Sequence, residues 1–377
     1  MVKIVKYTCA FIICVSTISC ENNIQQKDGY TTVEVNVDSV GSLDYYNDVL
    51  ESMNYIQLET NDKCRIGDIK QLIVNNGLIF VLSDCVYCFN MNGEYKYSIS
   101  QHGRAKNEFM RIGTISIVYD RLFVHDDISQ KVIVFDANTG DYVETMKMSD
   151  GFYKVYAVKD GYVTQNFGLG EDSLFYIFDA DDIVNVKRSA IPSEGYPVVL
   201  GNSCCSGDGV VYSDIFRNSA VKITTDGARK ILEVSLSKDK KLSDEDINDI
   251  IKKGDWHTSF ADRLHYLTYV NESDKYIVGS LVYNNCAVHL VYNKTTKESY
   301  CFRAVRDNIW QMVPINDHTS DGSYFYSIVD ATSIVAYRNY YGLGEEPVNS
   351  KWLPLYEKFA SVSENSNPIV MQYSFKL

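Results

Sequence analysis

The chain has 377 residues, of which 45% are hydrophobic and 23% charged, a balance that excludes a disordered, collagenous or coiled-coil protein. Its formal net charge of -13, without a cluster of Lys and Arg, excludes nucleic acid as a partner, because phosphate contacts need clustered cations. Tyrosine is abundant, at 29 residues, and because it favours pleated sheets and wet interfaces, the composition favours a β protein.

The N-terminal residues are typical of an export signal. Two lysines precede an apolar run over residues 7–18, which is shorter than the roughly 20 residues that a membrane-spanning helix needs. The tetrapeptide TISC at residues 17–20 resembles a bacterial lipobox, in which the cysteine carries lipid and becomes the first mature residue. We therefore expect a signal peptide over residues 1–19, lipid on Cys20, and a tether with an N-terminal segment over residues 20–52. An ordinary secretory signal is the alternative.

A hairpin pattern recurs along the rest of the chain. Each copy has an apolar strand, a polar turn with Asn, Asp, Thr or Gly, and a second strand, and the copies occupy residues 86–95, 132–142, 175–182, 220–227 and 289–296. Asn-Gly and Asp-Gly turns between apolar strands are the strongest short-range hairpin signal. The first four copies recur about every 45 residues, and a second hairpin, such as residues 69–82, lies upstream. Four short strands in each period predict the blades of a β-propeller.

The two cysteines of the first repeat form a CxxC sequence but do not predict a metal site. Cys85 and Cys88 lie in a strand-like run, where residues three apart point to opposite faces and lie about 10 Å apart. No second CxxC and no His pair with ligand spacing occurs in the sequence. We interpret both cysteines as buried free thiols and expect neither a metal nor a cofactor.

The interval before the last copy is longer than the others by about 20 residues, roughly half a repeat. The extra length falls in residues 238–259, and residues 242–254 within it predict a helix. Ser243 is an N-cap with an acid three residues on, acids fill the first turn, and lysines fill the last. We expect the helix to pack on the rim of the propeller, with a lid over the central funnel as the alternative. Further helices are expected around residues 43–52 and 347–360.

Three segments together resemble the six-bladed β-propeller lipoproteins of Bacteroides and its relatives, with a distant similarity to NHL-repeat propellers. Residues 55–60 (YIQLET) with residues 66–69 (IGDI) are similar to the first strand and first blade of that family. Residues 101–109 stand where the family has a Gly-Pro-Gly-Glu-aromatic loop, with Lys-Asn in place of Pro-Gly. Residues 364–371 are similar to its closing segment.

The resemblance implies an all-β fold over residues 53–377, a six-bladed propeller with four-stranded blades and short helical insertions. It also implies that a strand over residues 54–59 closes the last blade, which is otherwise built from residues 310–337 and 369–375. Physical reasoning favours such a closure, because an unclosed ring would leave strand edges free to part or aggregate.

No catalytic set is visible in the sequence. The six histidines lie in different units without a common spacing, and motifs of serine hydrolases, zinc proteases, P-loops and EF-hands are missing. Aromatic, histidine and arginine residues in or beside irregular segments are the candidate ligand-binding residues, because aromatic side chains suit sugars and protein partners. These candidates are Trp256, His257, Tyr266, Tyr269, Trp310, His102 and Arg104.

These observations predict a lipid-anchored, monomeric outer-membrane protein of the cell envelope that serves as a binding or scaffold module. Its partner would be a glycan, a peptide or another envelope protein, and which face of the membrane carries it stays open. The alternative is a lyase or hydrolase that acts on a polysaccharide or peptide at the central funnel. Catalytic side chains that converge at one mouth of the channel would favour the enzyme, and an aromatic-lined groove would favour binding.

Overall fold

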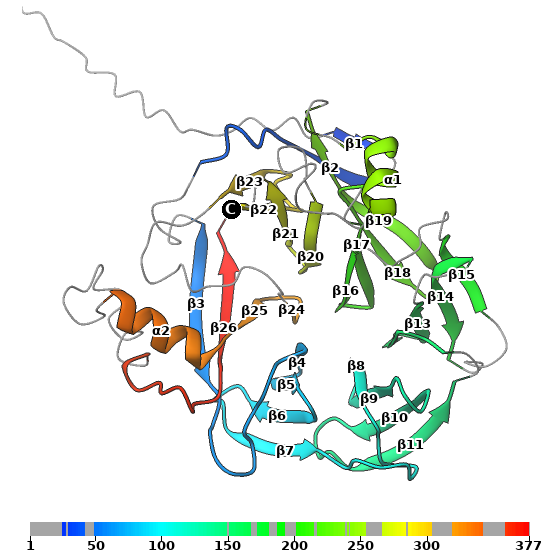
Figure 1. Cartoon of the computed structure of the whole chain (residues 1–377), viewed down its shortest axis with the longest axis vertical. Coiled ribbons are helices and arrows are strands. Elements are labelled where there is room, and N and C mark those ends of the chain that lie inside the picture. The colour runs from blue at the N-terminus through cyan, green and yellow to red at the C-terminus, as the bar shows by residue number, and fades with distance from the viewer. Residues whose placement is uncertain are drawn as a thin grey trace, which may run out of the picture.

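Six sheets stand around a central axis, and the first strand of each sheet lies nearest to that axis (Figure 1). The computed structural model describes residues 25–27, 29–41, 49–148, 151–166, 172–180, 187–192, 201–214, 217–237, 240, 242–253, 266–283, 286–303, 319–341 and 359–376. Five of the sheets contain four antiparallel strands in the order of a propeller blade, and the sixth contains four such strands with β1 and β2 added at its outer edge. The predicted six-bladed β-propeller is therefore confirmed.

The blades follow one another in chain order. Blade 1 contains β4 (Gln71–Asn75), β5 (Leu78–Leu82), β6 (Val86–Asn90) and β7 (Tyr95–Ile99), and blade 2 contains β8 (Ile112–Val118), β9 (Arg121–Asp126), β10 (Lys131–Asp136) and β11 (Tyr142–Lys147). Blade 3 contains β12 (Lys154–Val158), β13 (Gly161–Gln165), β14 (Ser173–Asp179) and β15 (Lys187–Pro192). Blade 4 contains β16 (Gly201–Ser206), β17 (Gly209–Asp214), β18 (Ser219–Thr224) and β19 (Gly227–Leu236), and blade 5 contains β20 (Tyr266–Glu272), β21 (Tyr276–Tyr283), β22 (Cys286–Asn293) and β23 (Ser299–Phe302).

The last blade is closed by the N-terminal strand of the ring. It contains β24 (Thr319–Ser320), β25 (Phe325–Val329), β26 (Ile369–Phe375) and, outermost, β3 (Leu50–Gln57). The β3–β26 pair runs from Gln57 opposite Ile369 to Leu50 opposite Phe375. The expected closure is confirmed, and the helix expected around residues 43–52 is wrong for residues 50–52, because this long-range pairing holds them in β3. Residues 43–48 lie outside the described part of the chain.

A helix follows β25, where the expectation was strand up to residue 337. This helix, α2 (Ala331–Tyr341), buries Ile334 completely. One turn later the guanidinium of Arg338 donates hydrogen bonds to three backbone carbonyls, among them that of Phe359 at 3.1 Å. The β-branched and aromatic residues of this segment are typical of strands, and tertiary packing overrides that preference. Of the helix expected over residues 347–360, only residues 359 and 360 are described, and both are helical.

The N-terminal segment adds two strands to blade 4. β1 (Gln25–Lys27) pairs with β2 (Tyr30–Val35), and β2 pairs in parallel with β19 at the outer edge of the blade. Val33 and Val35 are buried there, and the Asp38 carboxylate accepts a hydrogen bond from the Tyr283 hydroxyl of blade 5 at 2.7 Å. The segment that precedes the ring is thus bound to two blades as far as it is described.

The inserted helix forms as expected over Asp244–Lys253 (α1). The Ser243 N–H donates to the Asp246 carboxylate at 2.9 Å, and the Asp246 N–H donates to the Ser243 hydroxyl at 3.2 Å, which is the reciprocal pairing of a capping box. Ile247 is buried. Figure 1 shows α1 at the periphery beside β19, which fits the rim position and not a lid over the axis.

The core lies between neighbouring blades, and tyrosine is a large part of it. Twelve described tyrosines are buried, and they are Tyr55, Tyr87, Tyr156, Tyr162, Tyr176, Tyr212, Tyr269, Tyr276, Tyr283, Tyr292, Tyr326 and Tyr373.

Cys85 and Cys88 are buried free thiols, as predicted, and burial raises the pKa of Cys88 to about 11. In the described part of the chain, no helix has the length and apolarity needed to cross a membrane.

Candidate functional site

A cavity of 830 Å³ lies on the axis of the ring. All six inner strands contribute to its wall, and three of the lining residues, Gln71, Lys154 and Thr319, are the first residues of β4, β12 and β24. The cavity is therefore at the mouth where the inner strands begin, which is where the connections between blades arrive. Pockets of this size are typical of sites for small ligands or short chain segments.

Hydrogen bonds between neighbouring inner strands hold the wall in place. The Gln71 side chain bonds the backbone of blade 2, and the Tyr156 hydroxyl lies 2.8 Å from the Ser203 hydroxyl of blade 4. The Asn202 amide donates to a backbone carbonyl of blade 5. Because these polar groups are used within the wall, they stabilise the shape of the cavity more than they offer free donors to a ligand.

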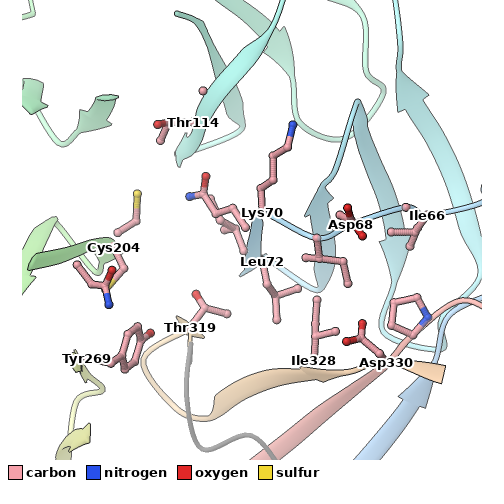
Figure 2. A pocket seen from close by; sticks show the side chains of 18 of the residues that line it. Ile66, Asp68, Lys70, Leu72, Thr114, Cys204, Tyr269, Thr319, Ile328 and Asp330 are labelled. Atoms are coloured by element: carbon pink, nitrogen blue, oxygen red, sulfur yellow. The ribbon is translucent and has the colours of Figure 1, made fainter. Parts of the chain in front are cut away.

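The two sides of the cavity differ in character (Figure 2). Blades 1 and 6 present half-buried aliphatic side chains, Ile66, Ile69, Leu72 and Ile328. Blades 3 to 5 present Lys154, Tyr156, Asn202, Ser203, Cys204 and Tyr269. We call these surfaces the aliphatic wall and the polar wall. The exposed acids Asp68 and Asp330 lie on the same side as the aliphatic wall (Figure 2), and the exposed Glu364 also lines the cavity.

Lys154 is the unusual member of the polar wall. It is half-buried, and within the described part of the chain its ammonium group has neither a hydrogen bond nor an ion pair. The ammonium group lies over the ring of Tyr153, whose centroid is 5.5 Å from Nζ. Burial lowers the pKa of Lys154, and the neighbouring Cys204 and Cys205 act weakly in the opposite direction. The wall therefore holds a cation that its own residues do not neutralise.

The Cys205 thiol, which also lines the cavity, is not suited to nucleophilic chemistry. Burial raises the pKa of Cys205 to about 12, so its thiol stays protonated at neutral pH, and the thiolate is the reactive form. The Cys204 thiol donates to the Val270 carbonyl at 3.5 Å. Among the described residues, no group of three His, Cys, Asp or Glu side chains is arranged to hold a metal ion.

Of the seven predicted site residues, the structure places Tyr269 in the cavity wall. Its side chain is 5% exposed and its hydroxyl accepts a hydrogen bond from the Asn271 amide at 3.1 Å. Tyr266 is the first residue of β20, and its side chain lies outside the described part of the chain. Trp256, His257 and Trp310 lie outside it entirely, as does the lipidation candidate Cys20, so their roles stay predictions.

His102 and Arg104 belong to the loop between blades 1 and 2 and do not line the cavity. The loop is closed on itself, because the Glu108 carboxylate accepts the Ala105 N–H at 2.9 Å and the His102 ring contacts Phe109 edge-on at 4.6 Å between centroids. Gly103 has a φ of 152°, and a side chain there would collide with Glu108. The loop therefore reaches a defined geometry without the Pro-Gly of the resembled family.

The sequence reasoning did not select Lys154 or Thr114, which also lines the cavity. Thr114 is 2% exposed and its hydroxyl has no hydrogen-bond partner in the described part of the chain. Lys154 is the first residue of the inner strand β12, and Thr114 is the third residue of the inner strand β8. Each strand follows a connection between blades. Aligning the repeats on the first strand of each blade, and not on the hairpin turns, would have brought these positions into one register.

Comparison with known proteins supports the fold and gives a family. The structure is similar to a Bacteroides fragilis protein described as a "Putative exported protein", with a TM-score of 0.68, 16% identity, and 92% of this chain and 99% of that chain covered. It is also similar to a member of the DUF4221 family from Bacteroides vulgatus, with a TM-score of 0.50, 12% identity and coverage of 87% and 97%. A search of curated proteins gave no match. Residues 31–374 match the domain of unknown function DUF4934, which is nearly the whole ring with its N-terminal strand, and the chain therefore belongs to the DUF4934 family.

Proposed function

We propose that this protein is a binding module of the cell envelope that holds a short peptide segment in its axial cavity. The observation that supports this proposal is the pairing of two unlike walls in a cavity of 830 Å³. A peptide residue has an apolar side chain and a polar backbone on the same unit, so it can place one against each wall. A preformed pocket with a few polar groups that can fix the orientation of a ligand is typical of small-ligand sites.

A peptide fits this cavity better than a saccharide does. A saccharide stacks its ring faces on exposed aromatic side chains, whereas Tyr156 and Tyr269 of the polar wall are buried. The hydroxyl groups of a sugar ring would lose hydrogen bonds to water against the half-buried aliphatic wall, and that wall offers them no replacement. A glycan therefore becomes the alternative outcome of the binding experiment.

We place the module in the envelope, attached to the membrane by lipid on Cys20. The similar Bacteroides fragilis protein is described as exported, and the lipobox-like TISC sequence follows a short apolar run. The attachment is tested by Cys20→Ala. We expect the variant to leave the membrane fraction, and a variant that stays there as firmly as the parent contradicts the anchor.

The binding experiment probes the protein with an array of peptides and glycans and blocks the cavity in one arm. Thr332 is exposed and lines the cavity at the start of α2, whereas the next residue, Ser333, is exposed and does not line it. We expect Thr332→Trp to reduce peptide binding at least tenfold, and Ser333→Trp to leave it unchanged. Equal loss in both variants, or binding of glycans alone, contradicts the proposal.

The same incubations separate binding from catalysis. A binding module returns the peptides and glycans intact after prolonged contact, which mass spectrometry of the recovered ligands detects. Shortened peptides or oligosaccharides would instead identify the hydrolase or lyase alternative, with the cavity-blocked Thr332→Trp protein as the control for contaminating enzymes.

A further inference from the structure

Other buried or half-buried lysines of the fold have hydrogen-bond or ion-pair partners. Lys222 lies 2.8 Å from the Asp208 carboxylate and also pairs with Glu272, Lys131 donates to a backbone carbonyl at 2.8 Å, and Lys240 donates to the Tyr283 hydroxyl at 3.0 Å. A buried cation without such partners costs free energy, because water is lost and nothing replaces it. Lys154 bears this cost at the wall of the cavity.

We infer that Lys154 is the receptor for the C-terminal carboxylate of the bound peptide, whose last side chain lies against the aliphatic wall. The inference rests on the proposed function and adds the chemical class of the ligand. An ammonium–carboxylate hydrogen bond is charge-assisted and stronger than a neutral one, particularly where water is partly excluded. The lowered pKa of Lys154 agrees with this role, because burial disfavours the charged ammonium group and a bound anion would stabilise it.

The geometry favours a chain end over an internal acidic residue. In a C-terminal residue the carboxylate and the apolar side chain leave the same Cα, so one residue carries both an anion for Lys154 and an apolar group for the aliphatic wall. An internal Asp or Glu carries its carboxylate at the end of its only side chain, so the same residue has no apolar group for the aliphatic wall, and a neighbouring residue must supply it. Without that group, Ile66, Leu72 and Ile328 would stay solvated, which loses the apolar burial that the cavity provides.

The charges of the cavity favour a monoanion over a dianion. Asp68, Asp330 and Glu364 line the same cavity as Lys154 and Lys70, so the carboxylates outnumber the ammonium groups. A dianionic phosphate would meet this negative field with a double charge, whereas a carboxylate pairs one to one with Lys154. The acids also favour neutral or basic residues in the part of the peptide that precedes its last residue.

The test compares two synthetic hexapeptide pools of identical randomised sequence that end in Leu, one with a free carboxylate and one amidated. Binding to the purified protein is measured by equilibrium dialysis at neutral pH and low salt. We expect the free-acid pool to bind about tenfold to a hundredfold more tightly, which is the range for a hydrogen bond to a charged group.

Three variants assign that difference to Lys154. In Lys154→Met we expect the free-acid and amidated pools to bind equally, and in Lys154→Arg we expect most of the difference to return, because the charge is kept. Lys159→Met is the matched control, since Lys159 is exposed at the opposite end of the same β12–β13 hairpin. It should behave like the parent. Circular dichroism of each variant checks that the propeller is folded.

The outcomes separate the inference from the function on which it rests. Equal binding of both pools by the parent leaves peptide binding in place and overturns the role of the carboxylate. A preference for the free acid that survives in Lys154→Met places the receptor elsewhere and also overturns the inference. No binding of either pool, alone or with binding of glycans on the array, overturns the proposed function and the inference together.

Discussion

The side-chain amide of Gln71 pairs with the backbone of Ile115 as if it were a neighbouring strand. Its Nε2 donates to the Ile115 carbonyl at 2.8 Å, and its Oε1 accepts the Ile115 N–H at 2.9 Å. Ile115 lies in β8 and is completely buried, so no water replaces these two bonds. One side chain thus joins blades 1 and 2 at the axial cavity.

Replacing Gln71 by Leu should destabilise the protein, because it leaves a buried N–H and a buried carbonyl without partners. We expect a loss of about 1–3 kcal/mol in the free energy of unfolding, measured by urea denaturation. Gln101→Leu changes an exposed glutamine and should stay within about 0.5 kcal/mol of the parent. If the two variants are equally stable, the pairing with Ile115 contributes nothing.

Asn367 carries the second junction of the ring. Its side chain is 3% exposed, accepts the Ile66 N–H at 2.9 Å and donates to the Glu59 carbonyl at 2.6 Å, so it joins the segment before β26 to the connection between β3 and β4. Asn367→Ala should cost about 2–4 kcal/mol, since several buried backbone groups lose their partners at once. Ser363→Ala, an exposed neighbour, is the control. Denaturation curves that coincide for the two variants contradict this role.

Lys154 should lower the stability of the ligand-free protein. Its pKa in the folded state lies below the ordinary value of a lysine, so between these two values the folded form binds fewer protons than the unfolded chain. The free energy of unfolding therefore rises with pH through that window, as the buried charge is removed. Lys154→Met should raise the melting temperature at neutral pH by about 1–3 °C, whereas Lys159→Met should not change it. A lower melting temperature would show that Lys154 has a stabilising partner.

Two buried histidines should make the propeller sensitive to acid. Burial lowers the pKa of both His125 and His289 to about 4, although Asp126 and Asp127 act in the opposite direction on His125. The unfolded chain takes up these protons near pH 6.5 and the folded form only near pH 4, so the free energy of unfolding falls as the pH is lowered between these values. Each histidine should cost about 2 kcal/mol between pH 6.5 and 5.

The substitution His289→Gln tests the contribution of one of these groups. Glutamine can keep the hydrogen bond that joins His289 Nδ1 and the Ser280 hydroxyl at 3.1 Å, and it takes up no proton. We expect the difference in free energy of unfolding between pH 6.5 and 5 to be about 2 kcal/mol smaller than in the parent. An unchanged pH dependence would mean that His289 does not control the acid sensitivity.

The ring could be predicted from the sequence because its signals are local or periodic. Turn residues such as Asn76 and Gly77, with φ of 48° and 75°, mark the hairpins, and the Ser243 capping box marks α1. The parallel pairing of β2 with β19 has no local signal, because it joins segments about 200 residues apart along the chain. Helix α2 was missed because its composition is typical of a strand and its packing decides its structure.

The candidate site was harder to predict than the fold. Tyr269 was selected for its aromatic ring and lies in the cavity wall. Its side chain is buried, so it packs within the wall and offers little surface to a ligand. Lys154 was not selected, because a single lysine at the start of a strand has no distinctive pattern. Its lack of an acidic partner becomes visible only in the folded ring, where no described residue of the neighbouring blades pairs with it.

β26 lies near the C-terminal end of the chain, so the last blade can form only after the other blades have been synthesised. β3 leaves the ribosome early, whereas its partner, residues 369–375, follows after the other five blades. During that interval β3 presents an unpaired edge, and a strand edge of this kind pairs readily with other chains. The ring can therefore close only after the last strand has been synthesised. A chain that ends before residue 369 keeps the edge of β3 unpaired, and we expect it to aggregate.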